Sequence, residues 1–127
     1  MSTKLPMNIT PQEHQKVKDH LIIPVMLDYI QEDISVIQSA GLKTDLILIN
    51  ALKKVQEDIL NEHFGIRMAL KKSGIKVYSQ QRTRAGIDAQ FLCRGYEHRI
   101  SLLWGMIRTE VLRKASLYTG IRLVSTS

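Results

Sequence analysis

The chain has 127 residues, of which 44% are hydrophobic and 24% charged, and its formal net charge is +6. This length and composition are typical of one globular domain with its own core, and they exclude long disorder, collagen-like repeats and a two-domain enzyme. The single cysteine, Cys93, excludes an internal disulfide framework and fits a reducing compartment.

The first predicted element is a helix that begins at Thr10. Thr10 fits the N-cap position, Pro11 the first helical position and Glu13 the third, which together form a capping box. Pro24 removes a backbone donor, so we expect a kink or a break there. Beyond it, Leu27, Ile30, Ile34 and Ile37 repeat at helical spacing, and Gly41 ends this part.

A further helix is predicted from Thr44. Gly65 could end it, but strong helix formers follow Gly65, so Ser73-Gly74 is the firmer stop. The apolar residues of this helix recur at spacings of four, three and four residues, which is typical of bundled packing: Leu48, Leu52, Val55 and Ile59. Ile47, Ile49 and Leu60 widen this apolar face. The pattern therefore predicts that this helix is the central one.

From Ile75 to Cys93, apolar and polar residues alternate on both sides of the connector Gln81–Gly86, which favours a β-hairpin. An irregular loop leading into a longer final helix is the alternative. After Arg94-Gly95, helical spacing predicts a long closing helix that ends at Gly120, with a stripe of Ile100, Trp104, Ile107, Val111 and Tyr118. The predicted fold is mostly α, a compact bundle of three to four helices with a small β-hairpin (about 75–93) before the long C-terminal helix. It forms a single helical domain over 1–127, with 1–9 and 121–127 frayed.

The residues that could perform chemistry do not form a recognisable site. The four histidines and Cys93 lack the paired, short-spaced ligands of a structural zinc site, so we expect no metal and no cofactor. Cys93 with His98 or His63 is a conceivable thiolate–imidazole pair, but apolar neighbours favour a packed, inert thiol. We therefore predict that the protein is not an enzyme.

Charge is distributed unevenly along the chain. Residues 1–65 carry 6 basic and 9 acidic side chains, whereas residues 66–127 carry 12 basic and 3 acidic ones. Between residues 66 and 87 every charged residue is a cation, and these are the candidate nucleic-acid-binding residues: Arg67, Lys71, Lys72, Lys76, Arg82 and Arg84. Arg82 and Arg84 are expected at an exposed hairpin tip, and Tyr78 could add a stacking surface.

These observations predict a small, non-enzymatic, cytoplasmic protein that binds DNA or RNA through backbone phosphates, as an oligomer. The Ile- and Lys-rich composition is typical of low-GC bacteria and their mobile elements or phages. The alternative is a structural or adaptor protein that assembles through helix packing as a homo-oligomer or with a protein partner. Apolar residues crowding Pro24 would supply that surface, and acidic and basic halves could stack head to tail. No membrane contact is expected. No apolar run approaches the roughly 20 residues that span a bilayer, and the basic residues are not on the same helix as a large exposed apolar face.

Overall fold

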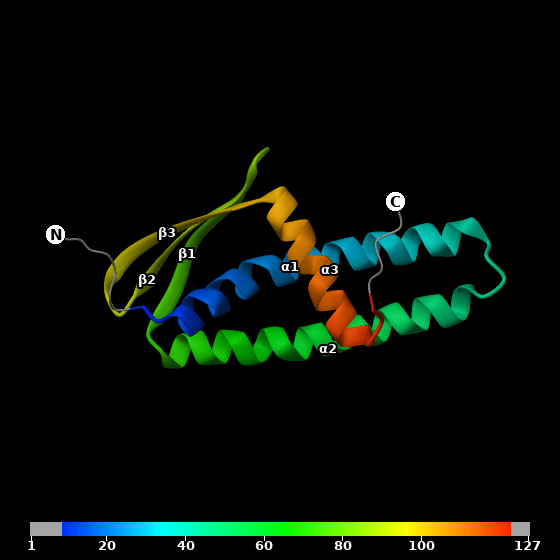
Figure 1. Cartoon of the computed structure of the whole chain (residues 1–127), viewed down its shortest axis with the longest axis horizontal. Coiled ribbons are helices and arrows are strands. Elements are labelled where there is room, and N and C mark those ends of the chain that lie inside the picture. Colours follow the sequence, from blue (N-terminus) through cyan, green and yellow to red (C-terminus); the bar gives the residue numbers. More distant parts are fainter. Residues whose placement is uncertain (1–8, 123–127) are drawn as a thin grey trace.

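The computed structural model describes residues 9–122, and this part of the chain forms three helices and three strands (Figure 1). In chain order these are α1 (Pro11–Ala40), α2 (Asp45–Lys72), β1 (Ile75–Arg82), β2 (Gly86–Cys93), β3 (Tyr96–Leu103) and α3 (Trp104–Thr119). Helices α1 and α2 run antiparallel, the sheet lies at the N-terminal end of α1, and α3 crosses the helix pair. The predicted fraying concerns ends that lie almost entirely outside the described residues.

The predicted start of α1 is confirmed. The Thr10 hydroxyl accepts the Glu13 backbone N–H at 3.1 Å, and the Glu13 carboxylate accepts the Thr10 N–H at 3.0 Å. The Glu13 carboxylate also accepts a hydrogen bond from each terminal nitrogen of Arg94, both at 3.0 Å. These bonds link the start of α1 to the turn between β2 and β3. The Arg94 guanidinium and the Thr10 N–H lower the pKa of the Glu13 carboxyl.

Of the kink or break predicted at Pro24, the break is wrong, because α1 runs unbroken for 30 residues with Pro24 inside it. Pro24 offers no N–H to the carbonyl of His20, which removes one helical hydrogen bond. Its neighbours Ile22, Ile23, Val25 and Met26 are all at most 1% exposed. Burying these side chains on several sides stabilises the helix by more than the lost hydrogen bond costs.

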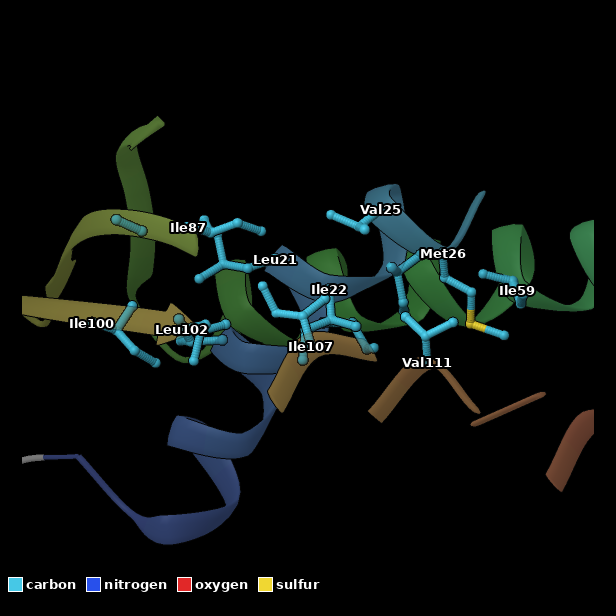
Figure 2. Packing of buried hydrophobic residues seen from close by; sticks show 14 of the residues in the cluster. Leu21, Ile22, Val25, Met26, Ile59, Ile87, Ile100, Leu102, Ile107 and Val111 are labelled. Atoms are coloured by element: carbon cyan, nitrogen blue, oxygen red, sulfur yellow. The ribbon is translucent and has the colours of Figure 1, made fainter. Parts of the chain in front are cut away.

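Helix α1, and not α2, is the central element, which corrects the expectation from sequence. Leu21, Ile22 and Ile23 are consecutive and point in directions about 100° apart, yet all three are buried. Figure 2 shows Leu21 near Ile87 of the sheet and Ile22 near Ile107 of α3. Because the sheet, α2 and α3 surround this part of α1, its residues around Pro24 leave no surplus apolar surface for assembly.

The fold class predicted from sequence is also wrong. The structure is not a bundle of three to four helices, and residues 75–93 do not form an isolated hairpin. They form two strands of a three-stranded antiparallel sheet of order β1-β2-β3. Residues 96–103, which we expected to begin the closing helix, form β3. Cys93 pairs with Tyr96 around a two-residue turn in which Arg94 and Gly95 have positive φ angles of 49° and 91°.

Helix α3 starts at Trp104 and is held against both long helices. Its Lys114 side chain is only 7% exposed and forms ion pairs with Asp19 of α1 at 3.3 Å and Glu62 of α2 at 3.7 Å. At its other end, the Trp104 indole N–H donates to the Thr83 carbonyl at 2.9 Å. Trp104 is therefore half-buried and fixes the turn between β1 and β2 to the start of α3.

Candidate nucleic-acid interface

A groove of about 520 Å³ lies where the C-terminal half of α2 meets the edge strand β1. Its lining residues come from α1, α2, β1 and the turn that precedes β1: His20, Arg67, Leu70, Lys71, Gly74, Ile75, Lys76 and Val77. Leu70 and Ile75 are buried and form an apolar floor. The groove therefore combines a low-dielectric base with charged walls.

Three of the six predicted cations meet in this groove. Arg67 and Lys71 lie one turn apart on α2, and Lys76 is the second residue of β1; all three are exposed. Gly74 makes this possible, because its positive φ of 75° lets the chain reverse immediately after α2. The Arg94 N–H then donates to the Gly74 carbonyl at 2.8 Å and holds the turn. Among the described lining residues there is no carboxylate.

The other three predicted cations lie elsewhere. Lys72 is exposed on the last turn of α2 but does not line the groove. Arg82 and Arg84 lie at the far end of β1, about 20 Å from Lys76 at the usual rise of an extended strand. The structure therefore does not bring the six residues into one patch.

The β1–β2 turn is not the freely displayed tip that we expected. Arg82 forms an ion pair with Asp28 of α1 at 2.8 Å, so part of its charge is neutralised. The turn is closed by the Thr83 N–H donating to the Gly86 carbonyl at 2.7 Å, and Trp104 holds it from α3. Arg84 remains exposed.

The proposed stacking residue, Tyr78, does not line the groove. Its hydroxyl donates to the Glu97 carboxylate of β3 at 3.0 Å, and its side chain is 45% exposed. It borders a shallow hollow with Gln90, His98 and Arg99. Tyr78 is therefore part of a polar sheet surface that also carries an acidic residue.

Sequence reasoning missed a histidine pair beside the groove. His20 Nδ1 and His63 Nε2 are 3.2 Å apart, joining α1 to α2. Burial, the neighbouring His20 and the charge of Arg67 lower the pKa of His63 to about 4, while burial and Arg67 also lower the pKa of His20. Both rings are therefore neutral near pH 7. No local spacing could have revealed this pair, because 43 residues separate its members.

A second hollow, of about 610 Å³, lies between α1, α2 and α3 and is lined mainly by apolar residues such as Ile30, Val55 and Val111. Glu32 and Asp33 also line it, together with Arg108. Because carboxylates repel phosphate, this hollow is a poorer candidate for a polyanion than the groove.

The sequence raised two kinds of chemical site, a metal site and a thiolate–imidazole pair of Cys93 with His98 or His63. In residues 9–122 no group of three or more His, Cys, Asp or Glu side chains could hold a metal ion. Burial raises the pKa of the Cys93 thiol, His98 stacks on Phe91 with ring centroids 4.9 Å apart, and His63 contacts His20. Cys93 is buried, and the raised pKa of its thiol disfavours the thiolate form that nucleophilic attack requires.

Comparison with known proteins places the chain in a family. The family described as "YhjD protein" matches residues 8–123, which is nearly the whole chain. The chain belongs to the YhjD family. No curated protein and no solved structure matches this YhjD family member. The family name states no activity or partner. Over the described residues, no helix is long and apolar enough to cross a bilayer.

Proposed function

We propose that this YhjD family protein is a non-enzymatic cytoplasmic protein that binds the phosphate backbone of DNA or RNA in the groove between α2 and β1. The observation that carries the proposal is the convergence of Arg67, Lys71 and Lys76 on one groove whose described lining contains no carboxylate. Of the six candidate residues, these three are the main phosphate contacts. Lys72 and Arg84 supply outer charge, and Arg82 contributes less because Asp28 neutralises it.

The groove suits phosphate for two reasons. Arginine offers a planar pair of donors, and lysine a mobile point charge, so together they can follow successive phosphates. The apolar floor formed by Leu70 and Ile75 lowers the local dielectric, which strengthens each ion pair. Because the contacts are to the backbone, binding should depend little on base sequence.

The test is a fluorescence anisotropy titration with labelled single- and double-stranded oligonucleotides at several salt concentrations. Three phosphate contacts predict a slope of log K against log salt of about −2 for single strands and about −3 for duplexes. The variant Arg67→Gln/Lys71→Gln/Lys76→Gln should bind at least about tenfold more weakly, with a shallower salt slope.

The matched control removes the same amount of charge elsewhere. Lys43, Arg108 and Arg122 are exposed and do not line the groove, so their triple substitution to Gln should leave affinity nearly unchanged. The proposal is wrong if the wild type binds neither DNA nor RNA at low salt. It is equally wrong if the control variant weakens binding as much as the groove variant does.

The alternative function, a structural or adaptor protein that assembles through helix packing, is favoured by a different observation. Apolar surface is exposed on α2, where Leu60, Phe64 and Met68 are each about half exposed. Assembly through this surface does not exclude nucleic-acid binding, because the groove opens along the neighbouring side of the same helix.

A further inference from the structure

An exposed apolar row runs along the outer face of α2. Leu60, Phe64 and Met68 follow one another at intervals of four residues and are 54%, 58% and 47% exposed. At about 100° per residue they point away from the side of α2 that packs on α1, which carries Ile59, Ile66 and Leu70. Contiguous exposed apolar side chains of this size are typical of an interaction surface.

The residues around this row are arranged symmetrically about Phe64. Leu60 and Met68 lie four residues to either side of it. Glu57 lies seven residues before it and Lys71 seven residues after it, so both lie two helical turns away on the same face. Glu57 and Lys71 are exposed. The two ends of the row therefore have the same apolar chemistry and opposite charges.

We propose that this α2 face is the interface of a symmetric homodimer, in which α2 packs antiparallel on α2 of a second copy with the two-fold axis at Phe64. This arrangement places Phe64 against the partner's Phe64 and Leu60 against the partner's Met68. It also places Glu57 against the partner's Lys71, and the symmetry makes this ion pair twice. A two-fold axis requires one patch to complement itself, and this α2 face does so in both apolar spacing and charge.

The charges of Glu57 and Lys71 favour a second copy of this chain as the partner, and they favour antiparallel packing over parallel packing. A parallel arrangement would place Glu57 against the partner's Glu57 and Lys71 against the partner's Lys71, and both contacts are repulsive. An anionic membrane surface would favour cations along the whole row, whereas Glu57 lies at one end of it. Rim charges set orientation more than affinity, so the apolar row supplies most of the binding energy.

The dimer does not depend on the proposed nucleic-acid function, although Lys71 lies where the two surfaces meet. In the dimer Lys71 pairs with the partner's Glu57, so Arg67 and Lys76 remain as the groove's contacts and the salt slope of a dimer should correspond to two phosphate contacts per groove in place of three. A dimer would carry two grooves, one on either side of the α2–α2 contact. Substitutions of Glu57, Leu60 and Phe64 separate the two proposals, because none of these residues lines the groove.

The first test is sedimentation equilibrium of the full chain from low micromolar to submillimolar concentration. The wild type should be a dimer at the upper end. Phe64→Glu and Leu60→Glu should each weaken dimerisation by about 30-fold or more, because a central buried anchor is replaced by a charge. Leu46→Glu is the matched control on the same helix. Leu46 is 71% exposed and lies beyond the symmetric row, so its substitution should leave dimerisation unchanged.

Circular dichroism shows whether each variant remains folded, and exposure of all three sites makes folding robust to these changes. A strictly monomeric wild type at submillimolar concentration overturns the proposal. So does a Leu46→Glu variant that dissociates as readily as Phe64→Glu, because assembly would then involve the whole helix surface or another part of it.

A charge exchange tests the antiparallel direction. Glu57→Lys alone and Lys71→Glu alone should each weaken the homodimer severalfold, since each creates two repulsive pairs. An equimolar mixture of the two single variants should form heterodimers at wild-type strength. In such a heterodimer the lysine introduced by E57K in one chain meets the glutamate introduced by K71E in the other, and the unchanged Lys71 meets the unchanged Glu57. A mixture no stronger than the separate variants overturns the antiparallel pairing.

Discussion

Helices α1 and α2 are nearly equal in length, at 30 and 28 residues, and both are rich in apolar side chains, yet the fold uses them differently. Near its middle, α1 is buried around most of its circumference by the sheet, α2 and α3. Helix α2 buries one face and leaves Leu46, Ile47 and Phe64 more than half exposed. The comparison shows that the angular spread of apolar residues, and not their number, tells how many neighbours a helix has.

The sequence of α1 already showed a wide angular spread of apolar residues around the helix axis. Leu21, Ile22 and Ile23 are consecutive, and three adjacent apolar residues cover about 200° of a helix surface. The proline that follows them suggested a broken helix with surplus apolar surface. In the fold these side chains are the centre of the core, and the surplus surface lies on α2.

The largest expected effect is the difference in stability lost when an apolar side chain is truncated on α1 or on α2. Ile23→Ala removes a side chain that is 0% exposed, and we expect it to lower the free energy of unfolding by about 2–5 kcal/mol. Leu46→Ala, at 71% exposure on α2, should change it by less than about 0.5 kcal/mol. Urea unfolding at a dilute protein concentration measures both. Equal losses at the two sites would contradict the different burial of the helices.

The next largest effect is expected at Lys114, which links α3 to both long helices. Lys114→Ala removes the buried cation that forms ion pairs with the Asp19 and Glu62 carboxylates, and should cost about 1–3 kcal/mol of unfolding free energy. Adding Asp19→Asn and Glu62→Gln to Lys114→Met should recover most of that loss, because the triple variant keeps the packed stem and removes all three charges. Thermal or urea unfolding of both variants checks this. A triple variant as unstable as Lys114→Ala would show that packing, and not charge, dominates.

The smallest effect concerns His63, where α2 contacts α1. Its pKa is lowered to about 4 in the folded chain and is about 6.5 in an unfolded one. Between these values the unfolded chain binds a proton that the folded chain does not, so stability is lost as the pH falls from about 6.5 to 4. Because the ring is only half-buried, we expect a loss of about 1–2 kcal/mol.

Urea unfolding at pH 7 and pH 5 measures this loss. His63→Gln keeps a hydrogen-bonding side chain without a titrating ring, so its stability should change less between the two pH values than that of the wild type. An equal change in both proteins would show that His63 does not carry the pH dependence. The carboxyl groups of Glu13 and Glu110, whose pKa values are lowered, titrate at more acidic pH and are common to both proteins.

Local signals in the sequence predicted local structure well. The capping box at Thr10 and Glu13 and the chain reversal at Ser73-Gly74 follow from side-chain hydrogen bonding and glycine geometry within a few residues. Strand β3 was mistaken for helix because Ile100, Trp104 and Ile107 fit helical spacing across a boundary. Ile100 belongs to the strand, and the other two belong to α3. The alternation of Ile100 and Leu102 with exposed Arg99 and Ser101 was the signal for the strand.

The cations of the candidate site were identified by composition, since an acid-free basic segment is visible in any sequence. Composition could not show which of these cations share the groove, because Arg82 is paired with Asp28, 54 positions earlier in the chain. It could not show the His20–His63 pair either, because that contact joins two different helices. By itself, then, the sequence determined where basic charge is concentrated and which residues begin or end helices. Only the tertiary structure decided which cations share a groove, which helix is central and which apolar residues stay exposed, because these depend on contacts between residues that are distant in the chain.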